Sequence, residues 1–428
     1  MGDTGILGAD GLVRSLTESF SAPVLFGYVR WILDEAEKRG MRRIYFLARD
    51  GYLLREMAER MCSSFGLDIE CRYLYCSRAS LRMPSYGIIG EEAMDLLLLG
   101  GYRVSACSVL QRAGLDEKQR SEVYDSCGLS DIDEDAVMSR NEFEQLSEKL
   151  RRCEIFRSYV SENSSRAYSD TIGYLRGEGL LDGGDIAIAD SGWTGSMQRS
   201  LRQLLKAEGF SGSITGFYFG MYAHPKSPED GEYLTWYFDA DGRTSDKIPF
   251  CNNLFECILS APHGMTVGYS EADGRYAPVL LKPPSEKLIA RIEQCAQAVL
   301  RYTDERLKKE QRDSFDERSL RKETRRLIKR YMKRPSREEA EFFGGYLFCD
   351  DVTEAYHMKL ADPSQVPQLK GYSIPARVLR RFSKRRGTVK APELLWPFGT
   401  IAFAPAAKRW WYRLNITVWE WLRYSLKK

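Results

Sequence analysis

The sequence lacks the long apolar runs and the basic leader that mark membrane-spanning and exported proteins. No uninterrupted apolar stretch approaches the roughly 20 residues that a helix needs to cross a bilayer. No positively charged segment with a short apolar core opens the chain. We therefore expect a protein that is neither exported nor membrane-spanning and that works in the cytoplasm.

Cysteine spacing typical of metal sites and disulfide frameworks is lacking as well. The ten cysteines include no Cys-x-x-Cys pair and no Cys/His ligand spacing. Several of them lie inside apolar runs, where a disulfide framework would be unusual. The pattern predicts reduced thiols at Cys62, Cys71, Cys76, Cys107, Cys127, Cys153, Cys251, Cys257, Cys295 and Cys349.

Charge is present but unevenly distributed. The 428-residue chain has a formal net charge of only +3, although residues 377–428 contain 13 Lys or Arg against two Glu. That segment has a surplus of 11 positive charges, so the rest of the chain has a deficit of 8. The basic surface is therefore a C-terminal feature, while the length and the 43% hydrophobic content suffice for two or three domains.

Apolar periodicity predicts an α/β fold with a parallel-sheet core. The expected elements are a helix over 10–39, a strand over 44–48, a turn at 49–51, a helix over 52–65 and a strand over 71–76. The layout returns with a strand over 185–189, a loop over 190–196, a helix through Leu205 and a strand over 215–221. In such crossover units, residues just past the strand ends face the ligand.

The chain is expected to have three regions. An α/β core covers residues 1–275 and contains a helical insertion at about 88–165, which is acidic and poor in strand signals. Residues 276–373 form a helical region that includes a helix over 313–333, and residues 374–428 form a basic, aromatic tail.

The segment after the strand 185–189 has the composition of an anion cradle. Asp190, Ser191, Gly192, Trp193, Thr194, Gly195 and Ser196 precede a predicted helix N-terminus. Backbone N–H groups and hydroxyls there can bind phosphate oxygens, with help from the helix dipole. Asp190 would repel phosphate, so we expect it to bond ribose hydroxyls or to help hold a Mg²⁺ that bridges a pyrophosphate. The alternative is a glycine-rich turn that binds nothing.

Arginines gather at the ends of the first two predicted strands. Arg49 stands beside Asp50, and Arg78 and Arg82 follow Ser77. Three guanidinium groups near one carboxylate suit a pyrophosphate or a sugar phosphate, because guanidinium binds phosphate oxygens in pairs and stays charged. The alternative is a structural ion pair with Asp50.

A third segment, residues 252–264, is predicted to be a short helix that breaks at Ala261-Pro262. Glu256 on this helix is a candidate general base for an acceptor hydroxyl, and His263 is a candidate for holding a phosphate or the acceptor. A histidine beside a proline turn is equally often a structural residue. His224 and His357 have no such context and receive no role.

Taken in order, these segments resemble the glycan phosphoribosyltransferase module of bacterial ribofuranosyltransferases. The resemblance covers roughly residues 10–270 and rests on Tyr45–Tyr52, Tyr73–Arg78, Asp190–Gln198 and Phe255–Met265. It implies a strongly diverged phosphoribosyltransferase that uses phosphoribosyl pyrophosphate (PRPP) as donor. The acceptor would be a nascent glycan of a surface polysaccharide such as O-antigen or capsule, left with a 5-phosphorylated ribofuranose.

The resemblance assigns roles to the candidate residues. Displacement at the anomeric carbon would invert it to a β-ribofuranoside, with arginines and Mg²⁺ neutralising the pyrophosphate and with Asp50 or Glu256 receiving the acceptor proton. Asp190 joins them as a catalytic and metal-binding residue. The donor-binding set is Arg49, Ser77, Arg78, Arg82, Ser191, Gly192, Trp193, Thr194, Gly195, Ser196, Gln198 and His263.

Relatives usually fuse this module to a haloacid-dehalogenase-type phosphatase, which needs an Asp-x-Asp directly after a strand. Asp50 is followed by Gly51-Tyr52 and Asp190 by Ser191-Gly192. We therefore expect that the chain lacks such a pair and that a separate phosphatase acts on the product.

The tail mixes the basic residues with Trp396, Phe398, Phe403, Trp410, Trp411, Tyr412, Trp419, Trp421 and Tyr424. That mixture is typical of segments that lie on an anionic leaflet, where a lipid-linked acceptor would reside, so the protein is expected at the inner face of the membrane. Alternatively the aromatics pack on the core. The rival functions are a non-catalytic scaffold and a phosphatase, each in the same pathway. The acidic core argues against a nucleic-acid partner.

Overall fold

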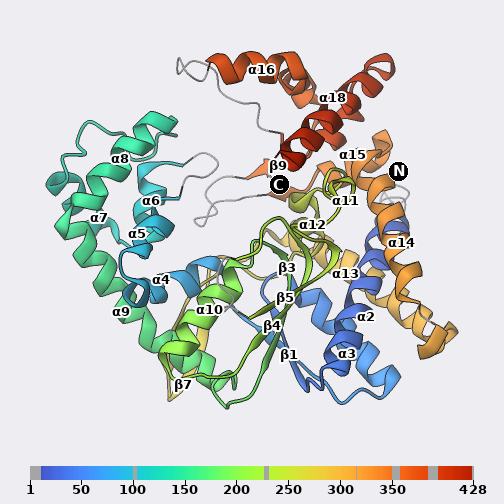
Figure 1. Cartoon of the computed structure of the whole chain (residues 1–428), viewed down its shortest axis with the longest axis horizontal. Coiled ribbons are helices and arrows are strands. Elements are labelled where there is room, and N and C mark those ends of the chain that lie inside the picture. The colour runs from blue at the N-terminus through green and yellow to red at the C-terminus, as the bar shows by residue number, and fades with distance from the viewer. Residues whose placement is uncertain are drawn as a thin grey trace, which may run out of the picture.

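The computed structural model describes residues 11–99, 104–225, 231–314, 316–348, 357–383 and 394–426. At its centre lies a five-stranded, fully parallel sheet in the order β2-β1-β3-β4-β5 (Figure 1). This confirms the predicted α/β fold with a parallel-sheet core. The strands are β1 (Arg43–Leu47), β2 (Glu70–Leu74), β3 (Ile186–Trp193), β4 (Ile214–Met221) and β5 (Glu232–Phe238).

Helices cover both faces of the sheet. Alternate strand residues such as Phe46 and Phe217 pack with α2 (Ala22–Lys38) and α3 (Gly51–Phe65) in one buried cluster. Tyr45 and Tyr218 point to the other face and pack with α9 (Glu154–Gly177) and α10 (Ser196–Ala207). Because successive side chains of a strand alternate between faces, sheets covered on both sides read as continuous apolar runs.

The first predicted elements are confirmed with small shifts in their bounds. Residues 11–38 are helical, with a π-helical turn at Thr17–Ser21 (η1) before α2. Helix α3 starts at Gly51, directly after β1. A Cβ at this position would lie 2.5 Å from the carbonyl carbon of Phe46, so only glycine lets the helix begin so close to the strand.

A helical insertion separates β2 from β3, as expected. It contains α4 (Arg78–Ile89), α5 (Glu92–Leu97), α6 (Ala106–Arg112), α7 (Glu117–Ser126), α8 (Arg140–Arg152) and the start of α9, with no strand among its described residues. It lies to one side of the sheet (Figure 1) and has its own buried cluster, to which Phe156 contributes. Ile172, further along α9, belongs to the sheet cluster. One long helix therefore connects the insertion to the core.

The prediction of reduced thiols is wrong for two of the ten cysteines. Cys127 and Cys153 form a disulfide, with their Cα atoms 5.8 Å apart and a sequence separation of 26. They lie at the ends of α7 and α8, and only the packing of these helices brings them together. The seven other described cysteines are free thiols, and Cys349 lies outside the described residues.

The strand β5 and the antiparallel hairpin of β6 (Thr266–Ala272) and β7 (Arg275–Leu280) were not predicted. The C-terminal region is mainly helical, as expected. Its elements are α11 (Thr244–Lys247), α12 (Asn252–Ile258), α13 (Glu286–Lys309), η3 (Arg312–Ser314), α14 (Glu317–Ile328), η4 (Lys329–Lys333), α15 (Arg337–Gly344), β8 (Leu347–Phe348), β9 (Met358–Lys359), η5 (Pro363–Tyr372), α16 (Ile374–Ser383), α17 (Pro397–Ile401) and α18 (Ala406–Ser425).

The aromatic residues of the tail divide between core and surface. Trp396 and Tyr412 are buried in the cluster that also holds α2, whereas Trp410 and Trp421 are 63% and 53% exposed. In the described part of the chain, no helix combines the length and the apolar character that a bilayer crossing requires. The basic residues Lys384, Arg385, Arg386, Lys390, Lys427 and Lys428 of the tail lie outside the described residues.

Candidate functional site

The candidate site lies at the carboxyl ends of β1 and β3. In the order 2-1-3-4-5 the chain reverses its direction of progress across the sheet between these two strands, and ligands of doubly wound sheets bind at that point. Arg49 and Asp50 lie in the short turn after β1, and the peptide bond between Ala48 and Arg49 is cis. Asp190 stands opposite them on β3.

The loop predicted over 190–196 is mostly strand. β3 continues through Trp193, pairing Asp190 with Tyr218 and Gly192 with Gly220 of β4. The polar residues and glycines are typical of a turn, but β4 offers backbone partners along their whole length. Gly192 has φ +111°, and a Cβ there would lie 2.4 Å from the carbonyl oxygen of Gly220, so the ladder requires glycine.

Only Thr194 and Gly195 separate β3 from α10. Gly195 caps the helix with φ +66° and supplies no side chain to the first turn, and Thr194 is exposed. The first N–H groups of a helix have no partner inside the helix, and its dipole favours an anion. Ser196 is the first helical residue. Phosphate binding at this end of α10 stays a prediction, supported by these N–H groups.

The surroundings of Asp50 shift the pKa of its carboxyl group strongly. Burial raises the pKa of Asp50 to about 6, while hydrogen bonds from Ser191 and the charges of Arg49 and Arg78 act to lower it. The buried hydroxyl of Ser191 thus contacts Asp50 and need not contact a ligand. A carboxyl group with a pKa near 6 can accept a proton at neutral pH.

Asp190 is perturbed further in the same direction. Burial raises the pKa of Asp190 most, and the neighbouring charges of Asp50 and Glu256 raise it too. Backbone N–H groups of Ser191 and Gly192 act to lower it. The hydroxyl of Tyr28 donates to the backbone oxygen of Asp190 over 2.7 Å, a contact that the sequence did not predict.

Glu256 reaches the same place from α12. The indole N–H of Trp193 donates to its Oε1 over 2.6 Å. Trp193 has φ +79°, which is uncommon for a bulky side chain, and its ring packs 5.3 Å from that of Phe250. Trp193 was expected to bind the donor; here it positions Glu256. The three carboxylates predicted from three separate segments are therefore brought together.

The predicted arginines also meet at this edge. Arg49 and Arg78 both act on Asp50, and Arg82 follows Arg78 by one turn of α4. Burial, and then the charge of Arg78, lower the pKa of Arg82, so this cluster favours an added anion. Ser77 caps α4, and its hydroxyl donates to the backbone oxygen of Thr266 over 2.6 Å.

Two further side chains of the predicted donor-binding set, besides Ser77, Ser191 and Trp193, are engaged inside the protein. Gln198 is fully buried, donates to the backbone oxygens of Ile214 and Glu232 and accepts from Tyr218. Nothing of its amide is left for a ligand. It therefore ties α10 to β4 and β5.

The second engaged side chain is His263, whose ring nitrogens contact the backbone oxygen of Gly264 at 2.8 Å and the hydroxyl of Tyr73 at 2.7 Å. Burial lowers the pKa of His263, and nearby Arg49 lowers it further. The ring is thus held neutral among Tyr52, Tyr73 and Tyr75. A neutral imidazole offers no charge to a phosphate.

The residues present fit a Mg²⁺ ion in part. The charge of Asp50 raises the pKa of Asp190, and a cation between them would relieve that repulsion. In the described chain, Asp50, Asp190 and Glu256 do not converge as a three-residue ligand set. Mg²⁺ is commonly held by one or two carboxylates and the phosphates of a substrate, so two suffice.

One Asp-x-Asp pair does follow a strand, which corrects the expectation that the chain lacks one. Asp239 and Asp241 come directly after β5, a strand that the sequence did not predict. Asp239 accepts from His224 Nε2 and from the backbone N–H of Asp241, each over 3.0 Å. These bonds lower the pKa of Asp239, although burial acts to raise it. The pair closes a turn at the edge strand, whereas Asp50 and Asp190 lie at the inner strands.

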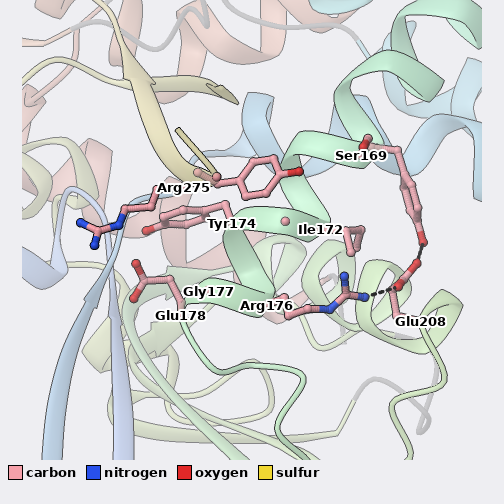
Figure 2. Close-up of a pocket in the computed structure, with 12 residues that line it drawn as sticks. Ser169, Ile172, Tyr174, Arg176, Gly177, Glu178, Glu208 and Arg275 are labelled. Carbon is pink, nitrogen blue, oxygen red and sulfur yellow. Dashed lines mark hydrogen bonds and ion pairs between the residues drawn. The ribbon is translucent and has the colours of Figure 1, made fainter. Parts of the chain in front are cut away.

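A separate hollow of about 690 Å³ lies between α9, the residue Glu208 after α10, and the turn of the β6–β7 hairpin (Figure 2). It lies toward the amino ends of β3 and β4, because α9 and α10 return to those ends. Within it, Arg176 and Tyr168 both bond to Glu208. None of the predicted site residues lines it.

Comparison with known proteins adds no relative. No protein-family model matches the chain, and no curated protein matches its sequence.

Proposed function

We propose that this chain is a glycan phosphoribosyltransferase, which transfers the 5-phosphoribosyl group of PRPP to a sugar acceptor of a surface polysaccharide. The proposal rests on one arrangement of side chains and backbone. Asp50 and Asp190, whose pKa values are raised by burial, lie with Glu256, the arginine cluster and the N-terminus of α10 at the carboxyl ends of β1 and β3. Perturbed groups at such a switch point are typical of active sites.

The donor would lie across the two strand ends. Arg49, Arg78 and Arg82 suit the pyrophosphate, because guanidinium groups bind phosphate oxygens in pairs and remain charged. The first turn of α10, with Thr194 and Ser196, suits the 5-phosphate. Asp190, joined by Asp50 if Glu256 is the base, would hold Mg²⁺ against the pyrophosphate, where the ion would supply neutralisation of the developing charge.

The acceptor would attack from the side of the carboxylates. The bond between ribose C1 and the pyrophosphate oxygen breaks as the acceptor oxygen bonds to C1, and pyrophosphate leaves with the electron pair. A single displacement on α-configured PRPP gives a β-ribofuranoside. The acceptor proton passes to Asp50, which is ionised above about pH 6, or to Glu256, which Trp193 holds in place.

Binding of the donor tests this proposal most directly. We expect calorimetry to show that PRPP binds more tightly with Mg²⁺ than without, and more tightly than ribose 5-phosphate. Arg49→Gln should weaken binding roughly 10- to 100-fold, since a hydrogen bond to a charged group contributes about 1.5–3 kcal/mol. Asp190→Asn should remove the effect of Mg²⁺.

Matched controls exist at the opposite end of the sheet. The side chains of Arg42 and Asp182 are 84% and 66% exposed there, so Arg42→Gln and Asp182→Asn change the same charges away from the site. Both should bind PRPP as the wild type does. Failure of PRPP to bind under any condition would favour the scaffold reading instead.

The acceptor is proposed to be lipid-linked, with the chain at the inner face of the membrane. The exposed Trp410 and Trp421 in the basic tail support this location. Trp396 and Tyr412 are buried, as the alternative interpretation, in which the tail aromatics pack on the core, predicts.

A further inference from the structure

A second basic feature lies outside both the candidate site and the tail. Between α11 and the junction of α14 with η4, the surface forms a hollow of about 390 Å³, called the basic hollow below. Five of its seven lining residues are cations and none is acidic. They are Ser245, Pro249, Arg326, Lys329, Arg330, Lys333 and Arg334.

The positive charge of the basic hollow is largely uncompensated. Arg330 forms a bidentate pair with Glu339, with both contacts at 2.7 Å. Within the described chain the other four cations have no carboxylate partner. Asp246, next to Ser245, is already paired with Arg325 over 3.1 Å. About four like charges therefore surround one hollow, an arrangement that an anion stabilises.

Helix α18 adds further charge beside the basic hollow. Burial lowers the pKa of Arg413, and Arg334 and Arg409 lower it further, which places Arg413 next to the hollow. The Nε of Arg413 is buried and has no hydrogen-bond partner. Figure 1 shows α18 beside α15 and α11, and Lys247 of α11 lies 5.9 Å from the ring of Tyr424. The hollow and α18 therefore form one surface.

An exposed apolar stripe borders this surface. Trp410, Leu414 and Trp421 occupy positions i, i+4 and i+11 of α18, which share one helix face, and they are 63%, 51% and 53% exposed. Tyr412 and Ile416 fill the opposite, buried face. By helical geometry Arg413 lies on the flank between these two faces. Tryptophan beside basic residues is typical of segments that bind at the headgroup level of a membrane.

We propose that the basic hollow binds the phosphate of an anionic lipid headgroup while Trp410, Leu414 and Trp421 enter the interface. Arginine and lysine would donate charge-assisted hydrogen bonds to the phosphate oxygens. The adjoining apolar stripe favours a lipid over a nucleic acid, which offers no apolar layer to these side chains. This site does not depend on the transferase reaction, and it adds the basic hollow, which lies outside the tail, to the membrane contact.

Vesicle sedimentation of the full chain tests the proposal. The wild type should sediment with vesicles of phosphatidylcholine containing phosphatidic acid, less so at high salt, and not with phosphatidylcholine alone. Combined Arg326→Gln, Lys329→Gln and Arg334→Gln should weaken this roughly 100-fold, at about 1 kcal/mol per cation near the surface. These exposed side chains have no carboxylate partner in the described chain, so the fold should persist.

A control with the same change in charge is available on the helical insertion. Lys118→Gln, Arg140→Gln and Arg152→Gln alter side chains that are 87%, 90% and 78% exposed, and this variant should sediment as the wild type does. Trp410→Ser with Trp421→Ser should also reduce sedimentation. Equal sedimentation of the basic-hollow variant and the control would overturn the proposal.

Two further binding experiments distinguish a lipid headgroup from other sources of phosphate. If pyrophosphate binds the wild type but not the basic-hollow variant while neither binds vesicles, the ligand is a soluble phosphate and the lipid proposal fails. If a labelled oligonucleotide binds in that pattern instead, the partner is a nucleic acid and the proposal fails equally.

Discussion

At the scale of single residues, the candidate site contains buried carboxyl groups whose ionised forms destabilise the folded chain. Burial raises the pKa values of Asp50 and Asp190, and the charge of Asp50 raises that of Asp190 further, so the folded chain holds their ionised forms at a loss of stability. Residues that lower stability in this way are typical of functional sites. The two aspartates should therefore have opposite effects on turnover and on stability.

Asp50→Asn tests this opposition. Turnover should fall about 100-fold or more if Asp50 is the base. The free energy of unfolding should rise on the order of 2 kcal/mol above pH 6, because a carboxyl raised to about 6 in the folded state releases its proton more easily when unfolded. That gain should shrink as the pH falls toward 4, where both states become protonated.

Urea denaturation at pH 8 and at pH 4.5 measures the gain, and Asp182→Asn serves as the control because its side chain is exposed. Loss of stability in Asp50→Asn at pH 8 would contradict the prediction. Full turnover in Asp50→Asn together with loss in Glu256→Gln would make Glu256 the base.

The candidate carboxylates could be predicted from the sequence because each stands in or beside a recognisable element. Asp50 and Asp190 follow apolar runs that read as strands, and the carboxyl ends of parallel strands meet at one edge. The supporting contacts could not be predicted. Trp193 and Glu256 are 63 residues apart in sequence, and Tyr28 and Asp190 are 162 apart. Contacts between residues so far apart in sequence produce no local pattern from which they could be predicted.

At the scale of elements, the errors arose where tertiary partners decide the structure. The segment Asp190–Trp193 has the composition of a turn, yet β4 pairs with it and keeps it in the sheet. The strand β5 was overlooked although its sequence, Glu232–Phe238, is rich in aromatic and β-branched residues that favour strands. The disulfide was missed because Cys127 and Cys153 meet only after α7 and α8 have packed.

That disulfide yields a prediction for the helical insertion. Replacing Cys127 and Cys153 with alanine should lower the stability of the insertion by about 3 kcal/mol, since the bond closes a loop of 26 residues in the unfolded chain. Hydrogen exchange should become faster in α7 and α8 and stay unchanged in the sheet strands, because the insertion has its own buried cluster.

Cys107→Ala is the matched control, because Cys107 is a free thiol in the same insertion. The prediction concerns oxidised protein, since a reducing compartment would open the bond. If both thiols of the native, unreduced protein react fully with an alkylating reagent, the bond is absent and the prediction fails.

At the scale of the whole molecule, the chain presents two separate chemical surfaces. The carboxylates and arginines of the candidate site lie at the inner strands of the sheet, whereas the basic hollow and the stripe on α18 belong to the C-terminal helices. The Asp-x-Asp of Asp239 and Asp241 lies at neither, at the end of the edge strand β5. The position of this pair bears on whether the product keeps its 5-phosphate.

We expect the product to keep its 5-phosphate. A phosphatase of the haloacid-dehalogenase type needs one free aspartate as nucleophile. Asp239 instead accepts from His224 and from the backbone N–H of Asp241, which close the turn after β5. Mass spectrometry of glycan incubated with the purified chain and PRPP should therefore show phosphorylated ribose. Ribose without phosphate, with the phosphate restored by Asp239→Asn, would show that this chain removes it; ribose without phosphate in both would point to a contaminating phosphatase.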